Sequence, residues 1–251
     1  ARSARRPPRI DTGPSVVYPR RAPHSRAVVP LPPLEPKIGL VERLAHWART
    51  LPAVVFLGVS LLVGNSIQML SLVVLPFSRA SFRGVNRWVA DTWWGWCVVL
   101  AEWVHGARIE VSGEDVPPGE SAILVVNHQQ MADIPPLLAL ARTKERLGDL
   151  KWFVKDPLKW VPGIGWGMVF LDCIFVKREW TMDRATIEAT FSRIVDNRVP
   201  LWLINFSEGT RITPSKLAAS RRWAEREGLG PTRHVLQPRP RGFAGAVVAL
   251  R

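Results

Sequence analysis

The sequence predicts an α/β fold, in which a mixed sheet is flanked by helices and preceded by a membrane-embedded helical hairpin. Two observations carry this prediction. After Gly106, short runs rich in β-branched and aromatic residues alternate with stretches of helical periodicity, which is typical of a buried sheet covered by helices. Before Gly106, 27 consecutive residues from Leu51 to Phe77 carry no charge, which is long enough to span a bilayer.

Composition divides the chain into a basic, proline-rich arm (1–37), membrane-embedded or interfacial helices (38–105) and an α/β domain (106–251). The arm holds seven Arg and one Lys against two acidic residues, so it supplies +6 of the net charge of +13. Such charge favours an anionic partner, namely nucleic acid, anionic lipid headgroups or a phosphorylated substrate. The two cysteines, Cys97 and Cys173, predict no disulfide framework and favour a reducing compartment.

The apolar region 51–77 is interrupted at its centre by the polar run GNSIQ, which would face hydrocarbon if one helix crossed the bilayer here. A second apolar stretch, 85–104, contains five tryptophans, and tryptophan prefers the headgroup interface. Arg79, Arg83 and Arg87 lie between or within these stretches. Because arginines accumulate on the cytoplasmic side, where the basic arm also belongs, we predict a hairpin that dips into the cytoplasmic leaflet. Two true spans are the alternative.

The elements of the α/β domain follow from periodicity in chain order. We expect strands at 107–111, 122–126, 151–155, 173–177, 201–206 and 234–238. We expect helices at about 136–147, 181–197 and 215–228. In open α/β sheets, functional groups gather beyond the carboxyl ends of strands, and polar stretches follow the strands at 122–126 and 201–206.

The first of these stretches, NHQQMAD, places His128 and Asp133 five residues apart. In one interpretation His128 is a buried structural residue and Asp133 is the N-cap of the next helix. A capping carboxylate would need the N–H groups of Pro135 and Pro136, which have none. We therefore predict that Asp133 orients the His128 imidazole as a general base. No activated Ser or Cys is evident, so direct deprotonation of a substrate hydroxyl is the expected chemistry.

The second polar stretch, NFSEGTR, has the residue types of a phosphate site. Arg211 offers a planar fork suited to phosphate, Thr210 offers a hydroxyl donor, and Gly209 lets backbone amides approach an anion. Glu208 is itself anionic and would orient Arg211 or accept a hydrogen bond from a substrate hydroxyl. The alternative interpretation is a turn with a surface ion pair.

Two further cations, Lys177 and Arg178, end the predicted strand at 173–177 and would add positive charge to the same pocket. The run GIGWG follows Pro162 and no strand, so it does not predict a dinucleotide site. The scattered histidines show no metal-ligand spacing, so we expect no metal.

Taken in order, these motifs resemble the glycerolipid acyltransferase family, which includes the 1-acyl-sn-glycerol-3-phosphate acyltransferases. NHQQMAD looks like the family's His-x4-Asp block, CIFVKR its second block, FSEGTR its third, and the proline of HVLQPR its fourth. The strings FVKREWTMDRATI, EGTRIT and LQPRPRGF look most like the membrane-anchored branch with lysophosphatidate and lysocardiolipin acyltransferases. The resemblance covers about residues 120–251. Between His128 and Asp133, Gln-Gln-Met-Ala departs from the family, where a small hydroxyl residue followed by an aromatic is common.

The resemblance implies transfer of a fatty acyl group to the hydroxyl of a lysophospholipid, with 1-acylglycerol-3-phosphate as the expected acceptor and phosphatidate as the product. Acyl-CoA or acyl carrier protein would supply the acyl group as co-substrate, without a cofactor. His128 would be the base and Asp133 its orienting partner. The resemblance places the acceptor's phosphate at Arg178, Glu208, Gly209, Thr210 and Arg211. Lipid substrates and soluble donors imply a cytoplasmic (inner) membrane location, with the catalytic domain facing the cytoplasm.

Three alternatives remain open. The acceptor is another lysophospholipid such as lysocardiolipin, the protein is a catalytically inactive lipid-binding scaffold, or it is a membrane-tethered nucleic-acid-binding protein, which the pI near 11 suggests. The arm's basic residues lack the interleaved aromatics that stack on bases, so we expect no nucleic acid. The expected partners are the acceptor, the thioester donor, membrane lipids and, where it carries the donor, acyl carrier protein.

Overall fold

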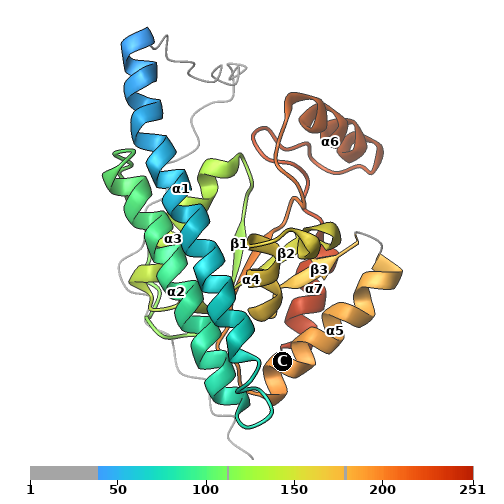
Figure 1. Ribbon diagram of the computed structural model, residues 1–251. Helices are drawn as coiled ribbons and strands as arrows, with labels where there is room; N and C mark the ends of the chain where they lie inside the picture. Colours follow the sequence, from blue (N-terminus) through green and yellow to red (C-terminus); the bar gives the residue numbers. More distant parts are fainter. Residues whose placement is uncertain (1–38, 112, 178–179, 251) are drawn as a thin grey trace, which may run out of the picture. The chain divides into compact units, whose positions relative to one another are not determined.

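A four-stranded parallel sheet organises the computed structural model, which describes residues 39–111, 113–177 and 180–250 (Figure 1). The strands are β1 (Ala122–Val126), β2 (Leu150–Lys155), β3 (Ile174–Val176) and β4 (Trp202–Phe206), in the order β1-β4-β2-β3. All three pairings are parallel, so the predicted α/β sheet is confirmed but its mixed character is wrong for the described strands. The reason is that a helix crosses back between each strand and the next.

Helices cover both faces of this sheet. Their bounds are α1 (Leu40–Ser71), α2 (Arg79–Trp103), α3 (Ile134–Thr143), α4 (Ile164–Phe170), α5 (Trp180–Asp196), α6 (Pro214–Arg226) and α7 (Pro240–Ala249). Three short 3-10 helices complete the described elements: η1 (Met131–Asp133), η2 (Leu147–Asp149) and η3 (Asp156–Trp160). The predicted helices at 136–147, 181–197 and 215–228 correspond to α3, α5 and α6, whereas the sequence did not predict α4 and α7.

Strand β4 shows why helices cover both faces. Trp202 and Ile204 belong to a buried cluster with residues of α2, α3 and α4. Leu203, which points to the opposite face, packs with Phe191 of α5 and Ala246 of α7. A strand that is apolar on both faces must be covered on both, and each such side chain contributes about 1.5–3 kcal/mol when fully buried.

The predicted strand at 107–111 is wrong. This segment follows α2 as irregular chain, it pairs with no described strand, and Val111 is 64% exposed. Its alternating pattern fits a strand locally, but a strand forms only where a neighbour accepts its hydrogen bonds and covers one face.

The predicted strand at 234–238 is also wrong, because its N–H groups bind side chains and no neighbouring strand. Leu236 N–H donates to Glu208 Oε2 (3.2 Å), and Gln237 N–H donates to Ser220 Oγ (2.9 Å). The segment bends at 234–235 and is anchored by polar side chains that are distant in the sequence.

The helical hairpin that the sequence predicts is present, because α1 and α2 pack on each other and are joined by a turn at 72–78. Among the described helices, α1 is long and apolar enough to cross a membrane by length and composition, which suggests membrane association. The helix runs through GNSIQ without a break. The predicted arm at 1–37 lies outside the described residues.

The polar centre of α1 faces protein. Asn65 and Gln68 are 4% and 1% exposed, and Asn65 Nδ2 donates to Gln68 Oε1 at 3.1 Å. Ser71 Oγ accepts from Nδ2 of Asn86 in α2 at 3.1 Å, and Gly167 of α4 lies beside the Asn65 and Gln68 side chains. Asn65 and Gln68, which would be costly in hydrocarbon, are therefore buried against α2 and α4. Ser66 of the same run is exposed, and its hydroxyl donates to the Leu62 carbonyl at 2.9 Å; the other exposed residues between Leu51 and Leu70 are apolar.

Candidate active site

His128 and Asp133 form a hydrogen-bonded pair beyond the carboxyl end of β1, which confirms the predicted contact. His128 Nδ1 lies 2.9 Å from Asp133 Oδ2. The same oxygen accepts the backbone N–H groups of Gln129 (2.8 Å) and Gln130 (2.9 Å). Asp133 makes no capping hydrogen bond to α3, as the prolines at its second and third positions require. The catalytic role of the pair stays a prediction.

This geometry determines which ring nitrogen is available as a base. An ionised carboxylate only accepts hydrogen bonds, so Nδ1 carries the hydrogen that it donates to Asp133, and Nε2 keeps a free lone pair. The ring stacks on Phe206 at the end of β4, with centroids 4.0 Å apart and planes inclined by 19°. The His128 side chain is 14% exposed. The imidazole is therefore held on two sides while part of the side chain stays exposed to solvent.

Glu208 fastens the His128 main chain to two other segments. Its Oε1 accepts the His128 N–H (3.1 Å) and its Oε2 accepts the Leu236 N–H (3.2 Å), while the residue is 2% exposed. The sequence favours a role beside Arg211 or a substrate hydroxyl, and the structure corrects this because both oxygens are turned inward. Sequence reasoning missed this clamp, since nothing local relates positions 128, 208 and 236.

We expect Glu208→Gln to destabilise the fold. A glutamine amide would point its NH₂ group at one of the two buried N–H donors, which costs about 1–3 kcal/mol. Thermal unfolding of the detergent-solubilised protein, followed by circular dichroism, measures this loss. Glu225→Gln is the matched control, because Glu225 is exposed on α6 and should change stability by less than about 0.5 kcal/mol. Equal unfolding temperatures for the two variants would refute the clamp.

The turn after Glu208 is fastened to the same histidine. Ile212 N–H donates to the His128 carbonyl at 3.0 Å, so both ends of the segment 208–212 bind the His128 main chain. Thr210 and Arg211 lie between these anchors, so their main chain is held close to that of His128, because each residue spans at most ~3.6 Å. The structure thus brings two of the predicted phosphate ligands to the dyad.

Gly209 shapes this turn. Its φ of 67° lies in the left-handed region that favours glycine, and its N–H donates to the Phe206 carbonyl at 2.8 Å. The predicted part of Gly209 in the phosphate site, to let backbone amides approach an anion, stays a prediction. Arg178, the remaining predicted phosphate ligand, lies outside the described residues.

Gln129 is the first of the four residues between His128 and Asp133 that depart from the family that the motifs resemble. Its Nε2 donates to the His234 carbonyl at 2.9 Å. The unusual side chain therefore ties the loop of the dyad to the segment before α7, and Glu208 binds that same segment at Leu236.

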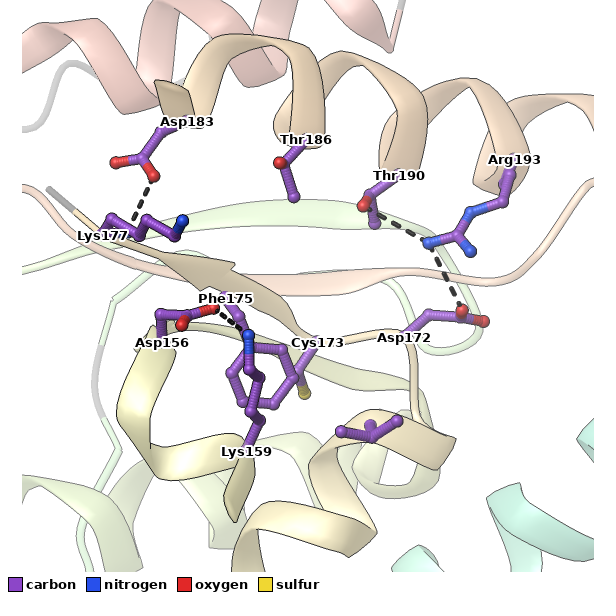
Figure 2. Close-up of a pocket in the computed structure, with 11 residues that line it drawn as sticks. Asp156, Lys159, Asp172, Cys173, Phe175, Lys177, Asp183, Thr186, Thr190 and Arg193 are labelled. Atoms are coloured by element: carbon purple, nitrogen blue, oxygen red, sulfur yellow. Dashed lines mark hydrogen bonds and ion pairs between the residues drawn. The ribbon is translucent and has the colours of Figure 1, made fainter. Parts of the chain in front are cut away.

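A cavity of about 510 Å³ opens beside β3, at the other edge of the sheet from β1 (Figure 2). Its charged lining residues are Asp156, Asp172, Asp183, Lys159, Lys177 and Arg193. Lys159 Nζ lies 2.7 Å from Asp156 Oδ1, and Arg193 Nη2 lies 3.9 Å from Asp172 Oδ1. Burial raises the pKa of the Cys173 thiol in the same lining to about 11, so this thiol is a poor nucleophile at neutral pH. With equal numbers of acids and bases, this cavity offers little net attraction to a phosphate.

The structure combines a parallel α/β fold with a histidine–aspartate pair beside the turn that carries Thr210 and Arg211. Comparison with known proteins identifies the family. Residues 108–232 match the family model described as Acyltransferase, and the chain belongs to this family, as its motifs predict.

Three relatives illustrate the similarity. The chain is 34% identical over 213 residues to 1-acyl-sn-glycerol-3-phosphate acyltransferase 2 of Brassica oleracea (83% of this chain, 54% of the relative). It is 34% identical over 202 residues to lysocardiolipin acyltransferase 1 of Gallus gallus (78% and 53%). It is 33% identical over 202 residues to 1-acyl-sn-glycerol-3-phosphate acyltransferase gamma of Homo sapiens (77% and 52%). The chain spans about half the length of these relatives, and no solved structure matches it.

Proposed function

We propose that this protein transfers a fatty acyl group from a thioester donor, acyl-CoA or acyl carrier protein, to the free hydroxyl of a lysophospholipid. The favoured acceptor is 1-acylglycerol-3-phosphate, which gives phosphatidate. The observation that carries the proposal is the pair His128–Asp133, joined through the His128 main chain to the turn with Thr210 and Arg211. The names of the relatives support the same class of reaction.

In the proposed reaction His128 is the general base. Its Nε2 takes the proton of the acceptor hydroxyl while the hydroxyl oxygen attacks the thioester carbonyl carbon. The C–S bond of the tetrahedral adduct then breaks, the new ester C–O bond remains, and the departing thiolate takes the proton from Nε2. Asp133 holds the ring in the required tautomer and stabilises the transient imidazolium. No covalent intermediate on the protein is needed.

The acceptor phosphate is proposed to bind at Thr210 and Arg211, on the turn that Gly209 shapes, with Arg178 as a further ligand. Thr210 supplies a hydroxyl donor and Arg211 a charged, planar donor set. Glu208 contributes by holding the turn against His128 and does not touch the phosphate. Because the turn is anchored to His128, a phosphate bound there places a nearby glycerol hydroxyl within reach of Nε2.

Product analysis tests the proposal. The purified full chain is incubated with a panel of lysophospholipids, which includes 1-acylglycerol-3-phosphate and a lysocardiolipin, and with acyl-CoA or acylated carrier protein. Mass spectrometry should detect phosphatidate as the main product. Lysocardiolipin is the second candidate acceptor, because the Gallus gallus relative bears that name. If no member of the panel gains an acyl chain from either donor, the proposal is rejected.

We also propose that the protein lies at the cytoplasmic (inner) membrane with its catalytic domain facing the cytoplasm. The apolar face of α1 and the arginines near the hairpin turn support this placement. Thioester donors do not cross bilayers, so inside-out vesicles should acylate added acceptor at once. Right-side-out vesicles should do so only after permeabilisation. The opposite pattern would overturn the orientation.

A further inference from the structure

Two cations to which the sequence assigned no role flank the turn 209–211. Lys216, in the first turn of α6, has its Nζ 2.7 Å from Thr210 Oγ1 and 3.1 Å from the Arg211 carbonyl oxygen. Arg239, just before α7, lies over Gly209, because a Cβ atom at position 209 would lie 3.4 Å from its Cδ and 4.0 Å from its Nε. Together with Arg211, which belongs to the turn itself, three cations from three segments therefore meet at one short turn.

The hydrogen bonds of Lys216 leave one of its N–H donors without a described partner. An ammonium group has three N–H donors, and two of them are used by Thr210 and Arg211. The Thr210 hydroxyl accepts from Lys216, so its own hydrogen is directed elsewhere. The turn therefore presents an ammonium N–H and a hydroxyl O–H next to each other, which is a donor set for one anion.

Helix stability does not explain a lysine at this position. Thr213 is the N-cap of α6, and its side chain accepts from the Lys216 N–H, so Lys216 belongs to the first helical turn. The positive end of the helix dipole lies there and disfavours a cation. Within the part of the chain that the structure describes, Lys216 forms no ion pair that would offset this cost, and Glu208, the acid nearest in sequence, is turned inward to His128 and Leu236.

The surrounding sequence keeps the same excess of positive charge. From Gly209 to Arg241 it has eight Lys or Arg residues and two Glu. Some of these arginines are structural, since Arg221 donates to the carbonyls of Thr232 and Arg233. Lys216 and Arg239 differ from them because they converge on the turn that is bonded to the dyad.

We propose that Lys216 and Arg239 extend the acceptor site and bind the additional charge of a phosphomonoester, so that the site selects a phosphomonoester over a phosphodiester. This inference rests on the proposed function. A phosphomonoester carries about −1.5 to −2 at pH 7 and three terminal oxygens. A phosphodiester carries a single charge and two free oxygens. Arg211 and Thr210 suffice for the diester, whereas the additional charge and oxygen of the monoester need Lys216 and Arg239.

The test compares two acceptors that differ at the phosphate, 1-acylglycerol-3-phosphate and 1-acylglycerophosphoglycerol. Lys216→Gln should raise KM for the monoester about tenfold, as expected for the loss of one charged hydrogen bond, and should change KM for the diester less than about threefold. The kcat for the monoester should change little, because Lys216 does not touch the reacting atoms. Lys216→Arg should restore most of the selectivity, and Arg239→Gln should act in the same direction as Lys216→Gln.

Arg222→Gln is the matched control, because it removes the same charge from an exposed position of α6 and should leave both KM values unchanged. Equal changes for both acceptors in Lys216→Gln, or the same loss of selectivity in Arg222→Gln, would overturn the inference.

A binding measurement separates this inference from the proposed function. The wild type and Lys216→Gln are titrated by calorimetry with sn-glycerol 3-phosphate and with glycerophosphocholine, which are water-soluble headgroups. Preferential binding of the monoester that Lys216→Gln abolishes supports the inference even if no acceptor is acylated, in which case the proposed function alone fails. Equal binding of both compounds by the wild type rejects the inference even if acylation is observed.

Discussion

His128→Ala should lower kcat by roughly 10² to 10⁴ and leave the fold and the membrane association intact. The expected loss is that of a positioned general base. The proposal assigns proton transfer to Nε2 alone, and the ring makes only two described contacts, the Asp133 hydrogen bond and the stacking on Phe206. The main-chain bonds to Glu208 and Ile212 do not involve the side chain, so alanine keeps the loop in place.

The measurement is the single-turnover rate of acyl transfer to the acceptor found by product analysis, with membrane association followed by vesicle flotation. His234→Ala is the matched control. His234 lies close to the dyad, but its described contact is the carbonyl that accepts from Gln129, which alanine retains. Its rate should stay within a few-fold of the wild type. An unchanged rate in His128→Ala would reject the general-base mechanism and favour an inactive, lipid-binding protein.

The chemistry of neighbouring residues was enough to predict the His128–Asp133 dyad. The features that the sequence did not predict depend on contacts between residues far apart in the chain. Pro135 and Pro136 exclude the cap from the sequence alone, because a missing N–H is a property of the residue. The clamp of Glu208 joins positions 128, 208 and 236, and no periodicity relates them. The false strand at 234–238 has the same origin, since its N–H groups bind side chains far away in the sequence.

The hairpin of α1 and α2 shows the same limit of prediction from a single sequence. Composition identified an apolar helix with a polar interruption, and the interruption suggested that the helix could not cross a bilayer. Asn65 and Gln68 are in fact buried against α2 and α4, where the Asn65 amide donates to Gln68 Oε1, so these side chains are kept away from lipid. A single sequence gives the polarity of each residue but not the direction in which the residue faces, because that depends on packing partners elsewhere in the chain.

Asp133→Asn should lower kcat by up to about 10⁴ while the protein stays folded. The carboxylate oxygen Oδ2 accepts three hydrogen bonds, one from His128 Nδ1 and two from the amides of Gln129 and Gln130. If the asparagine oxygen takes the place of Oδ2, it can accept the same three hydrogen bonds, but it carries no charge and stabilises the transient imidazolium less. If the NH₂ group takes that place, it faces Nδ1 and favours the tautomer that carries the hydrogen on Nε2. A ring with a protonated Nε2 cannot remove the hydroxyl proton, and the corresponding substitution in a serine protease costs about 10⁴ in kcat.

Combining the two substitutions tests whether the residues act as a unit. If Asp133 works only through His128, the double variant His128→Ala/Asp133→Asn should be no slower than His128→Ala alone, because the base is already gone. If the two losses multiply instead, Asp133 acts on the substrate independently and the dyad assignment is wrong.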